Sequence, residues 1–190
     1  MAIHKSFPTS PYEQLNPEYR WFPADETLRD SSYEKLLPPL VHKIRKEIKN
    51  WRDSNYAGAS NTSKSLLNWW FNTEHIVPKS DGTMVEFKYY FAQREAVETI
   101  IYLYEVAKVK DKYDLIKYDS SGAVSTGMFD EEWLRLVVKM ATGSGKTKVM
   151  SLIITWCYFH KIYEENSKLS TNFLVIAPNI IVLDRLRTDF

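Results

Sequence analysis

Apolar positions in the first half of the chain recur at the three- and four-residue spacing of amphipathic helices. The spacing predicts one helix from about residue 40 to 52, a second from residue 62 or 63 to 71, and a third that begins at Ala92. Residues 1–32 lack this spacing and are rich in Pro, Ser, Asp and Glu. We therefore expect residues 1–86 to form an N-terminal extension that is irregular at first and then mainly helical.

The second half shows a different pattern. Two apolar runs, residues 134–140 and 172–177, flank a long apolar helix predicted over residues 146–163 and buried on nearly every face. Such runs are typical of strands in a parallel sheet that is covered on both sides. Residues 76–86, with a turn at Asp81-Gly82, are predicted as loop. Residues 111–130 are predicted as a long flexible connection, unless they hide a strand.

A glycine-rich loop joins the first predicted strand to the long helix. Residues 140–147 read Met-Ala-Thr-Gly-Ser-Gly-Lys-Thr. Because Gly143 and Gly145 lack a Cβ, the backbone can turn tightly here and present successive N–H groups to a phosphate. The helix adds the positive end of its dipole. The pattern predicts a nucleoside triphosphate site in which Lys146 reaches the β- and γ-phosphates and Thr147 binds Mg²⁺.

Lys146 and Thr147 are the predicted catalytic residues of this site. The residues predicted to contact the nucleotide in the loop are Thr142, Gly143, Ser144, Gly145, Lys146, Thr147 and Lys148. The strict P-loop pattern has a glycine at position 140, where this chain has Met140. The alternative is a glycine turn between a buried strand and a buried helix, with an exposed lysine. Residue order and the strand-to-helix context favour the nucleotide site.

This loop resembles motif I of superfamily 2 helicases and translocases, the DEAD/DEAH-box proteins that include the Res subunits of type III restriction enzymes. Upstream, residues 90–93 (Tyr-Phe-Ala-Gln) resemble the Q-motif region of that superfamily. The resemblance implies that Gln93 hydrogen-bonds the edge of adenine and that Tyr90 or Phe91 stacks on the base, with ATP as the nucleotide. Taken alone, Gln93 is a polar residue on a helix surface.

Downstream, residues 175–179 (Val-Ile-Ala-Pro-Asn) are similar to motif Ia. The resemblance implies that Asn179 or Arg185 contacts the phosphates of a nucleic-acid strand. A strand end followed by Pro178 as the opening of a helix explains the same sequence equally well. Residues 51–75 also look like the N-terminal region of large bacterial Res-type proteins, so the resemblance covers nearly the whole chain.

The resemblance implies an α/β fold in which residues 87–190 form the start of a RecA-like ATP-binding domain with a parallel sheet. No acidic Walker B pair follows Lys146, and Asp130-Glu131-Glu132 precedes the loop without following a strand. We therefore expect the N-terminal part of a longer ATP-dependent DNA translocase or helicase, in which ATP hydrolysis needs downstream motifs. The resemblance implies duplex DNA and a Mod-like methyltransferase subunit as partners. It also implies an endonuclease activity elsewhere in the protein.

The composition narrows these expectations further. A net charge of +1 gives no overall basic field, so contacts with nucleic acid must come from local patches. One such patch, or else a solvated helix face, is the basic side of the first helix: Lys43, Arg45, Lys46, Lys49 and Arg52. The single cysteine, Cys157, excludes an internal disulfide. With no signal segment and no run long enough to cross a bilayer, we expect a cytoplasmic protein without membrane contacts.

Two other classes of protein remain open. One is a nucleotide-dependent interaction module, whose triphosphate site changes shape without driving a motor. The other is a small P-loop kinase, which needs a phosphate-acceptor site and lid arginines close downstream, and the chain ends before either. Stimulation of ATP turnover by DNA separates the motor from the interaction module.

Overall fold

A computed structural model describes residues 40–119, 122, 124–125, 127, 135–176, 184 and 186–187. The predictions for residues 1–32, for the acidic run 130–132 and for Asn179 and Arg185 lie outside these residues. The chain divides into two compact units, residues 1–47 with 111–134 and residues 48–110 with 135–190.

The first unit contains the start of α1 (Val41–Asp53) and the short helix α4 (Lys112–Ile116). The carboxylate of Asp111 caps α4 by accepting hydrogen bonds from the N–H groups of Tyr113 and Asp114, at 2.8 and 3.1 Å. The Nζ of Lys43 donates to the carbonyl of Asp119 at 2.6 Å. The predicted long connection over residues 111–130 therefore begins with a capped helical turn.

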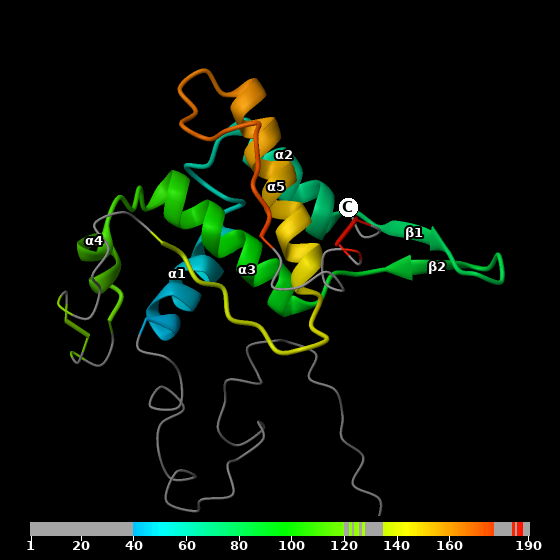
Figure 1. Ribbon diagram of the computed structural model, residues 1–190, viewed down its shortest axis with the longest axis horizontal. Helices are drawn as coiled ribbons and strands as arrows, with labels where there is room; N and C mark the ends of the chain where they lie inside the picture. The colour runs from blue at the N-terminus through cyan, green and yellow to red at the C-terminus, as the bar shows by residue number, and fades with distance from the viewer. Residues whose placement is uncertain are drawn as a thin grey trace, which may run out of the picture. The chain divides into compact units, whose positions relative to one another are not determined.

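The second unit holds the end of α1 and six further elements: α2 (Asn61–Asn72), β1 (His75–Pro78), β2 (Met84–Phe87), α3 (Phe91–Ile101), the π-helix η4 (Tyr102–Val106) and α5 (Lys146–Tyr163). The four helices predicted from the apolar spacing are confirmed. Helix α5 packs against α2 and α3 (Figure 1). The side chains buried among these elements are Ile48, Trp51, Tyr56, Leu67, Trp70, Val97, Ile101, Tyr102, Leu103, Val149, Leu152 and Trp156.

Helix α5 is less buried than its composition predicts. Its buried residues follow a single stripe: Val149, Leu152, Trp156 and His160. Met150, Tyr158 and Ile162 lie on the other sides and are exposed. The prediction that nearly every face is buried is wrong, because α2 and α3 cover only one side of this helix in the part of the chain that the structure describes.

The predicted parallel sheet is not present among the described residues. Residues 135–140 and 172–176 run without strand pairing, and Val137 and Leu174 are 83% and 85% exposed. A parallel strand requires a neighbour for its N–H and C=O groups and helices over its faces. Neither apolar run has this environment in the structure, so their composition alone does not make them strands.

A β-hairpin takes the place of the loop predicted over residues 76–86. Strands β1 and β2 pair antiparallel, with His75 opposite Phe87 and Pro78 opposite Met84. The predicted turn is confirmed: Gly82 has a φ of 81°, and Asp81 accepts a hydrogen bond from the N–H of Thr83 at 2.9 Å. Strands of four residues are too short to show an alternating pattern, which is why the sequence did not reveal them.

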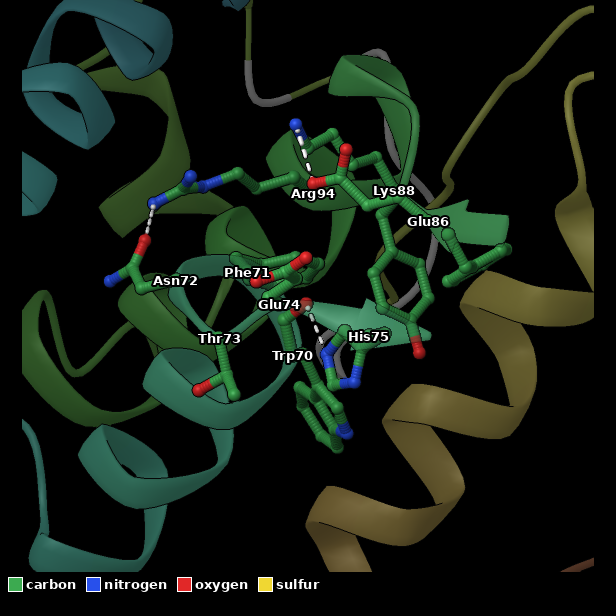
Figure 2. Close-up of a pocket in the computed structure, with 11 residues that line it drawn as sticks. Trp70, Phe71, Asn72, Thr73, Glu74, His75, Glu86, Lys88 and Arg94 are labelled. Carbon is green, nitrogen blue, oxygen red and sulfur yellow. Dashed lines mark hydrogen bonds and ion pairs between the residues drawn. The ribbon is translucent and has the colours of Figure 1, made fainter. Parts of the chain in front are cut away.

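A hollow of about 410 Å³ lies where the end of α2, the hairpin and the start of α3 meet (Figure 2). Its lining residues are Trp70, Phe71, Asn72, Thr73, Glu74, His75, Glu86, Phe87, Lys88, Tyr89 and Arg94. The Nε2 of His75 donates to the carbonyls of Trp69 and Trp70, at 2.8 and 3.3 Å. His75 thus satisfies the orphan carbonyls at the end of α2, as expected of a structural histidine.

A polar cluster around Glu105 joins the start of α2 to η4 and to the end of α5. The carboxylate of Glu105 accepts hydrogen bonds from Ser60 Oγ at 2.8 Å, from Ser63 Oγ at 2.6 Å and from the backbone N–H of Ser60 at 3.0 Å. It also lies 2.8 Å from the Nε2 of His160. The Nε1 of Trp156 donates to Ser63 Oγ at 2.7 Å. These bonds fix the register of α5 against α2.

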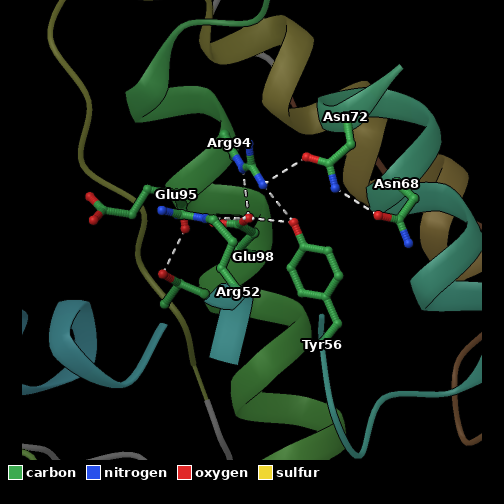
Figure 3. Close-up of polar contacts among 8 residues, drawn as sticks. Arg52, Tyr56, Asn68, Asn72, Arg94, Glu95 and Glu98 are labelled. Atoms are coloured by element: carbon green, nitrogen blue, oxygen red, sulfur yellow. Dashed lines mark hydrogen bonds and ion pairs between the residues drawn. The ribbon is translucent and has the colours of Figure 1, made fainter. Parts of the chain in front are cut away.

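The most deeply buried charge of the second unit is the carboxylate of Glu98 on α3 (Figure 3). Arg52, from the end of α1, donates from its Nε to both carboxylate oxygens, at 2.9 and 3.1 Å, and its Nη2 forms an ion pair with one of them. Arg94 donates from its Nε at 2.8 Å, and the hydroxyl of Tyr56 donates at 2.8 Å. Every donor of this cluster comes from a different turn or element.

Burial raises the pKa of Tyr56 above its usual range, and the charge of Glu98 raises it further. The phenol therefore stays protonated and keeps donating to the carboxylate. Arg94 in turn donates to the Tyr56 oxygen at 2.9 Å and to Oδ1 of Asn72 on α2 at 3.2 Å. Glu98 thus fixes α1, the loop after it, α2 and α3 to one another.

Replacing Glu98 tests how much the fold depends on this cluster. Glu98→Gln removes the charge at nearly constant volume and leaves two arginines facing a neutral amide. We expect the free energy of unfolding to fall by about 3 kcal/mol, the usual cost of removing one partner of a buried ion pair. Urea unfolding followed by tryptophan fluorescence measures it.

Lys49→Met provides the matched control, because the Lys49–Asp53 pair is half-exposed on α1. We expect this change to cost no more than about 0.5 kcal/mol. A loss below about 1 kcal/mol for Glu98→Gln would show that the cluster is not what holds these helices together.

Candidate nucleotide-binding site

The glycine loop forms a tight turn that leads directly into α5. Gly143 and Gly145 both have a φ of 81°, in the left-handed region that favours glycine. Gly145 is also the residue that caps α5, so the helix begins at Lys146. The first N–H groups of a helix have no partner within it. The first N–H groups of α5 therefore have no partner within the helix, whereas the N–H of Ser144 in the loop donates to the carbonyl of Ala141 at 3.3 Å.

Lys146 is exposed and folds back over the loop. Its Nζ donates to the carbonyl of Met140 at 3.2 Å and to that of Ala141 at 3.0 Å. Ser144 also reaches the carbonyl of Ala141, through its Oγ at 2.6 Å. The ammonium group thus lies at the mouth of the loop, where an anion could replace the two carbonyl oxygens as its partner.

Gln93 connects this loop to α3. Its Oε1 accepts a hydrogen bond from the N–H of Tyr90 at 2.9 Å, and its Nε2 donates to the carbonyl of Ser144 at 3.1 Å. The side chain is only 5% exposed. Two predicted site residues that are 51 positions apart in the sequence therefore meet in space.

The two aromatic residues proposed to stack on a base have different environments. Tyr90 precedes α3 and is 68% exposed. Phe91 lies beneath the guanidinium of Arg52, whose Cζ is 5.7 Å from the ring centroid. Of the two, Tyr90 is the one whose ring is accessible to a ligand.

The remaining predicted site residues either belong to the glycine loop and the start of α5 or lie outside the described residues. Thr142, Lys146 and Lys148 are exposed, while Ser144 and Thr147 are partly covered. Asn179 and Arg185 are not among the residues that the structure describes. Over the described ranges, no three His, Cys, Asp or Glu side chains gather as metal ligands.

The sequence did not reveal two contacts near the loop, the bond between Gln93 and Ser144 and the buried pair of Arg94 and Glu98. The link between Gln93 and Ser144 has no local signal, because it joins segments far apart in the chain. The pair formed by Arg94 and Glu98 was visible as an i, i+4 spacing, but such a pair usually lies in solvent. In the structure, the Glu98 side chain is fully buried.

A second hollow, of about 500 Å³, lies at the other end of α5. It is lined by His160, Tyr163, Glu164, Glu165, Asn166 and Ser167. No residue of the glycine loop lines either of these two hollows. No helix of the described segments is both long and apolar enough to cross a membrane.

Comparison with known proteins identifies one family. The model of one protein family, described as type III restriction enzyme, res subunit, matches residues 86–190, which include α3, the glycine loop and α5. No match was found among the curated proteins or among the solved structures. Because the family model covers more than half of the chain, this protein belongs to the family of type III restriction enzyme Res subunits.

Proposed function

We propose that this chain supplies the ATP-binding part of a DNA translocase or helicase of the Res type. Membership in this family supports the proposal, because it implies a helicase-like, ATP-dependent function. The observation that carries the proposal is the loop of residues 141–145, with two left-handed glycines, an exposed Lys146 at its mouth and α5 starting directly behind it. Backbone N–H groups, a helix N-terminus and a lysine are the three components of a phosphate site.

The loop can bind a triphosphate through a simple exchange of partners. The N–H groups of the loop and of the first turn of α5 would hold the phosphate oxygens. The N–H of Ser144 would leave the carbonyl of Ala141, and Lys146 would leave the carbonyls of Met140 and Ala141, for the phosphates. A bond between an ammonium and a phosphate is stronger than one to a neutral carbonyl, which favours this exchange. Thr147 would hold the Mg²⁺ that accompanies ATP and shields the charge of the phosphates.

The contact with the base and the contacts with DNA are further parts of the proposal. Tyr90 is proposed to stack on the base, because its side chain is exposed beside Gln93. Asn179 and Arg185 are proposed to bind the phosphates of duplex DNA, on the strength of the resemblance to motif Ia. A Mod-like methyltransferase subunit as partner and a cytoplasmic location follow from the same family resemblance, as does ATP hydrolysis completed by further motifs of the protein.

Removing the lysine tests the phosphate site. We expect Lys146→Ala to weaken the binding of Mg·ATP at least tenfold, because a charge-assisted bond contributes about 1.5 kcal/mol or more. The fold should be nearly unchanged, since the side chain is exposed and contacts only loop carbonyls among its described partners. Isothermal titration calorimetry gives the affinity, and thermal unfolding checks the fold.

Lys161→Ala is the matched control, because Lys161 lies at the far end of the same helix, where its Nζ donates to the carbonyl of Ser167. This variant should bind Mg·ATP as the wild type does. Equal affinities for wild type and Lys146→Ala would remove the nucleotide site from the proposal.

ATP turnover in the complete Res-type protein separates the motor from the interaction module. We expect duplex DNA to raise the rate of phosphate release and Lys146→Ala to abolish that stimulated rate. A coupled phosphate-release assay with and without DNA measures both. Nucleotide binding without DNA-stimulated turnover would favour the interaction module instead.

A further inference from the structure

We propose that Gln93 is a positioning residue that braces the glycine loop against α3, so that the loop holds its phosphate-binding shape before any nucleotide arrives. The inference rests on the proposed nucleotide site and names a support of that site. It also gives Gln93 a role different from reading the edge of adenine.

The hydrogen bonds of Gln93 carry the first step. One end of its amide is fixed to the start of α3 through Tyr90, and the other end holds the carbonyl of Ser144. Reading adenine requires the same oxygen and nitrogen as a paired acceptor and donor. A side chain that is 5% exposed, with both ends bonded to the protein, offers little of that pair to a ligand.

The close approach of Gln93 to the loop is the second observation that supports the proposal. A Cβ built on Gly145 would lie 2.1 Å from the Nε2 of Gln93 and 3.3 Å from its Cδ. Gly143 has the same φ, but a Cβ there would meet nothing within 4 Å. An alanine at position 145 would therefore strain the left-handed backbone and would also force the amide of Gln93 to move from the carbonyl of Ser144.

The far end of the brace is itself fixed. Arg94, the next residue on α3, and Glu98, one turn later, belong to the buried cluster with Arg52 and Tyr56. The start of α3 therefore cannot shift without breaking charged bonds in the core. A loop held by one side chain gains rigidity only when that side chain stands on a rigid support.

Amide hydrogen exchange on the nucleotide-free chain tests the brace directly. Gln93→Met removes both hydrogen bonds at similar side-chain length. Gln93→Glu keeps an oxygen for the N–H of Tyr90 and loses the donor to Ser144. We expect the peptide that covers residues 141–148 to exchange at least threefold faster in both variants, because the loop loses its anchor in each.

Thr99→Ala is the matched control, because it removes a side-chain bond further along α3, from Thr99 Oγ1 to the carbonyl of Glu95 at 2.7 Å. Exchange of the loop should not change in this variant. Unchanged loop exchange in Gln93→Met, or an equal increase in Thr99→Ala, would overturn the proposal.

Binding measurements separate bracing from base reading. A braced loop predicts that Gln93→Met weakens pyrophosphate, ATP and GTP by the same factor, about fivefold, since all three use the loop and pyrophosphate has no base. A loss for ATP alone would show that Gln93 reads adenine and would contradict the brace. If wild-type protein bound none of the three, the proposed nucleotide site would fall, and the exchange experiment would still decide the brace.

The two glycines provide an independent test in the absence of ligand. Gly145→Ala and Gly143→Ala carry the same backbone strain, but only the first adds the clash with Gln93. We expect Gly145→Ala to lower the melting temperature more than Gly143→Ala does. In a Gln93→Ala background, where the clashing amide is gone, the two alanine variants should melt alike. An equal loss from both glycines in the wild-type background would mean that Gln93 does not press against Gly145.

Discussion

The buried carboxylate of Glu98 is the constraint on which the second unit depends. A charge removed from water is tolerated only when its hydrogen-bonding sites are filled and its charge is balanced. Arg52, Arg94 and Tyr56 do this together, and they come from α1, α3 and the loop between α1 and α2. The apolar core can form in many similar ways, whereas this carboxylate allows one arrangement. It selects the relative placement of the helices that the apolar residues then stabilise.

The proposed nucleotide site likewise depends on a contact between segments that are far apart in the sequence. The backbone of the glycine loop supplies the donors, but a loop with two left-handed glycines is not rigid by itself. Its shape depends on a neighbour, and α3 is that neighbour through Gln93. Lys146 and the loop backbone would contact a ligand, whereas Gln93 contacts the loop from the side of α3.

The sequence predicted what local spacing and local chemistry determine. The helices α1, α2, α3 and α5 follow from apolar periodicity, and the turn at Gly143 and Gly145 follows from the lack of a Cβ. It could not show the partner of Gln93 or the burial of Glu98, because both depend on segments that meet only in the fold. The apolar residues 135–140 and 172–176 show the opposite error. Their composition suggested strands, but a strand is defined by its neighbours, and composition does not supply them.

The position of Arg52 and Tyr56 has a consequence for where this protein can be divided. Both residues precede residue 86, where the segment that the family model matches begins, yet both donate hydrogen bonds to the carboxylate of Glu98 inside that segment. The segment that the family model matches is therefore shorter than the segment that must fold together. A polypeptide cut at residue 86 would keep Glu98 and lose two of its three donors, together with Leu67 and Trp70 of the core. A shortened protein should therefore begin before residue 40, so that residues 86–190 keep α1 and α2, which stabilise them.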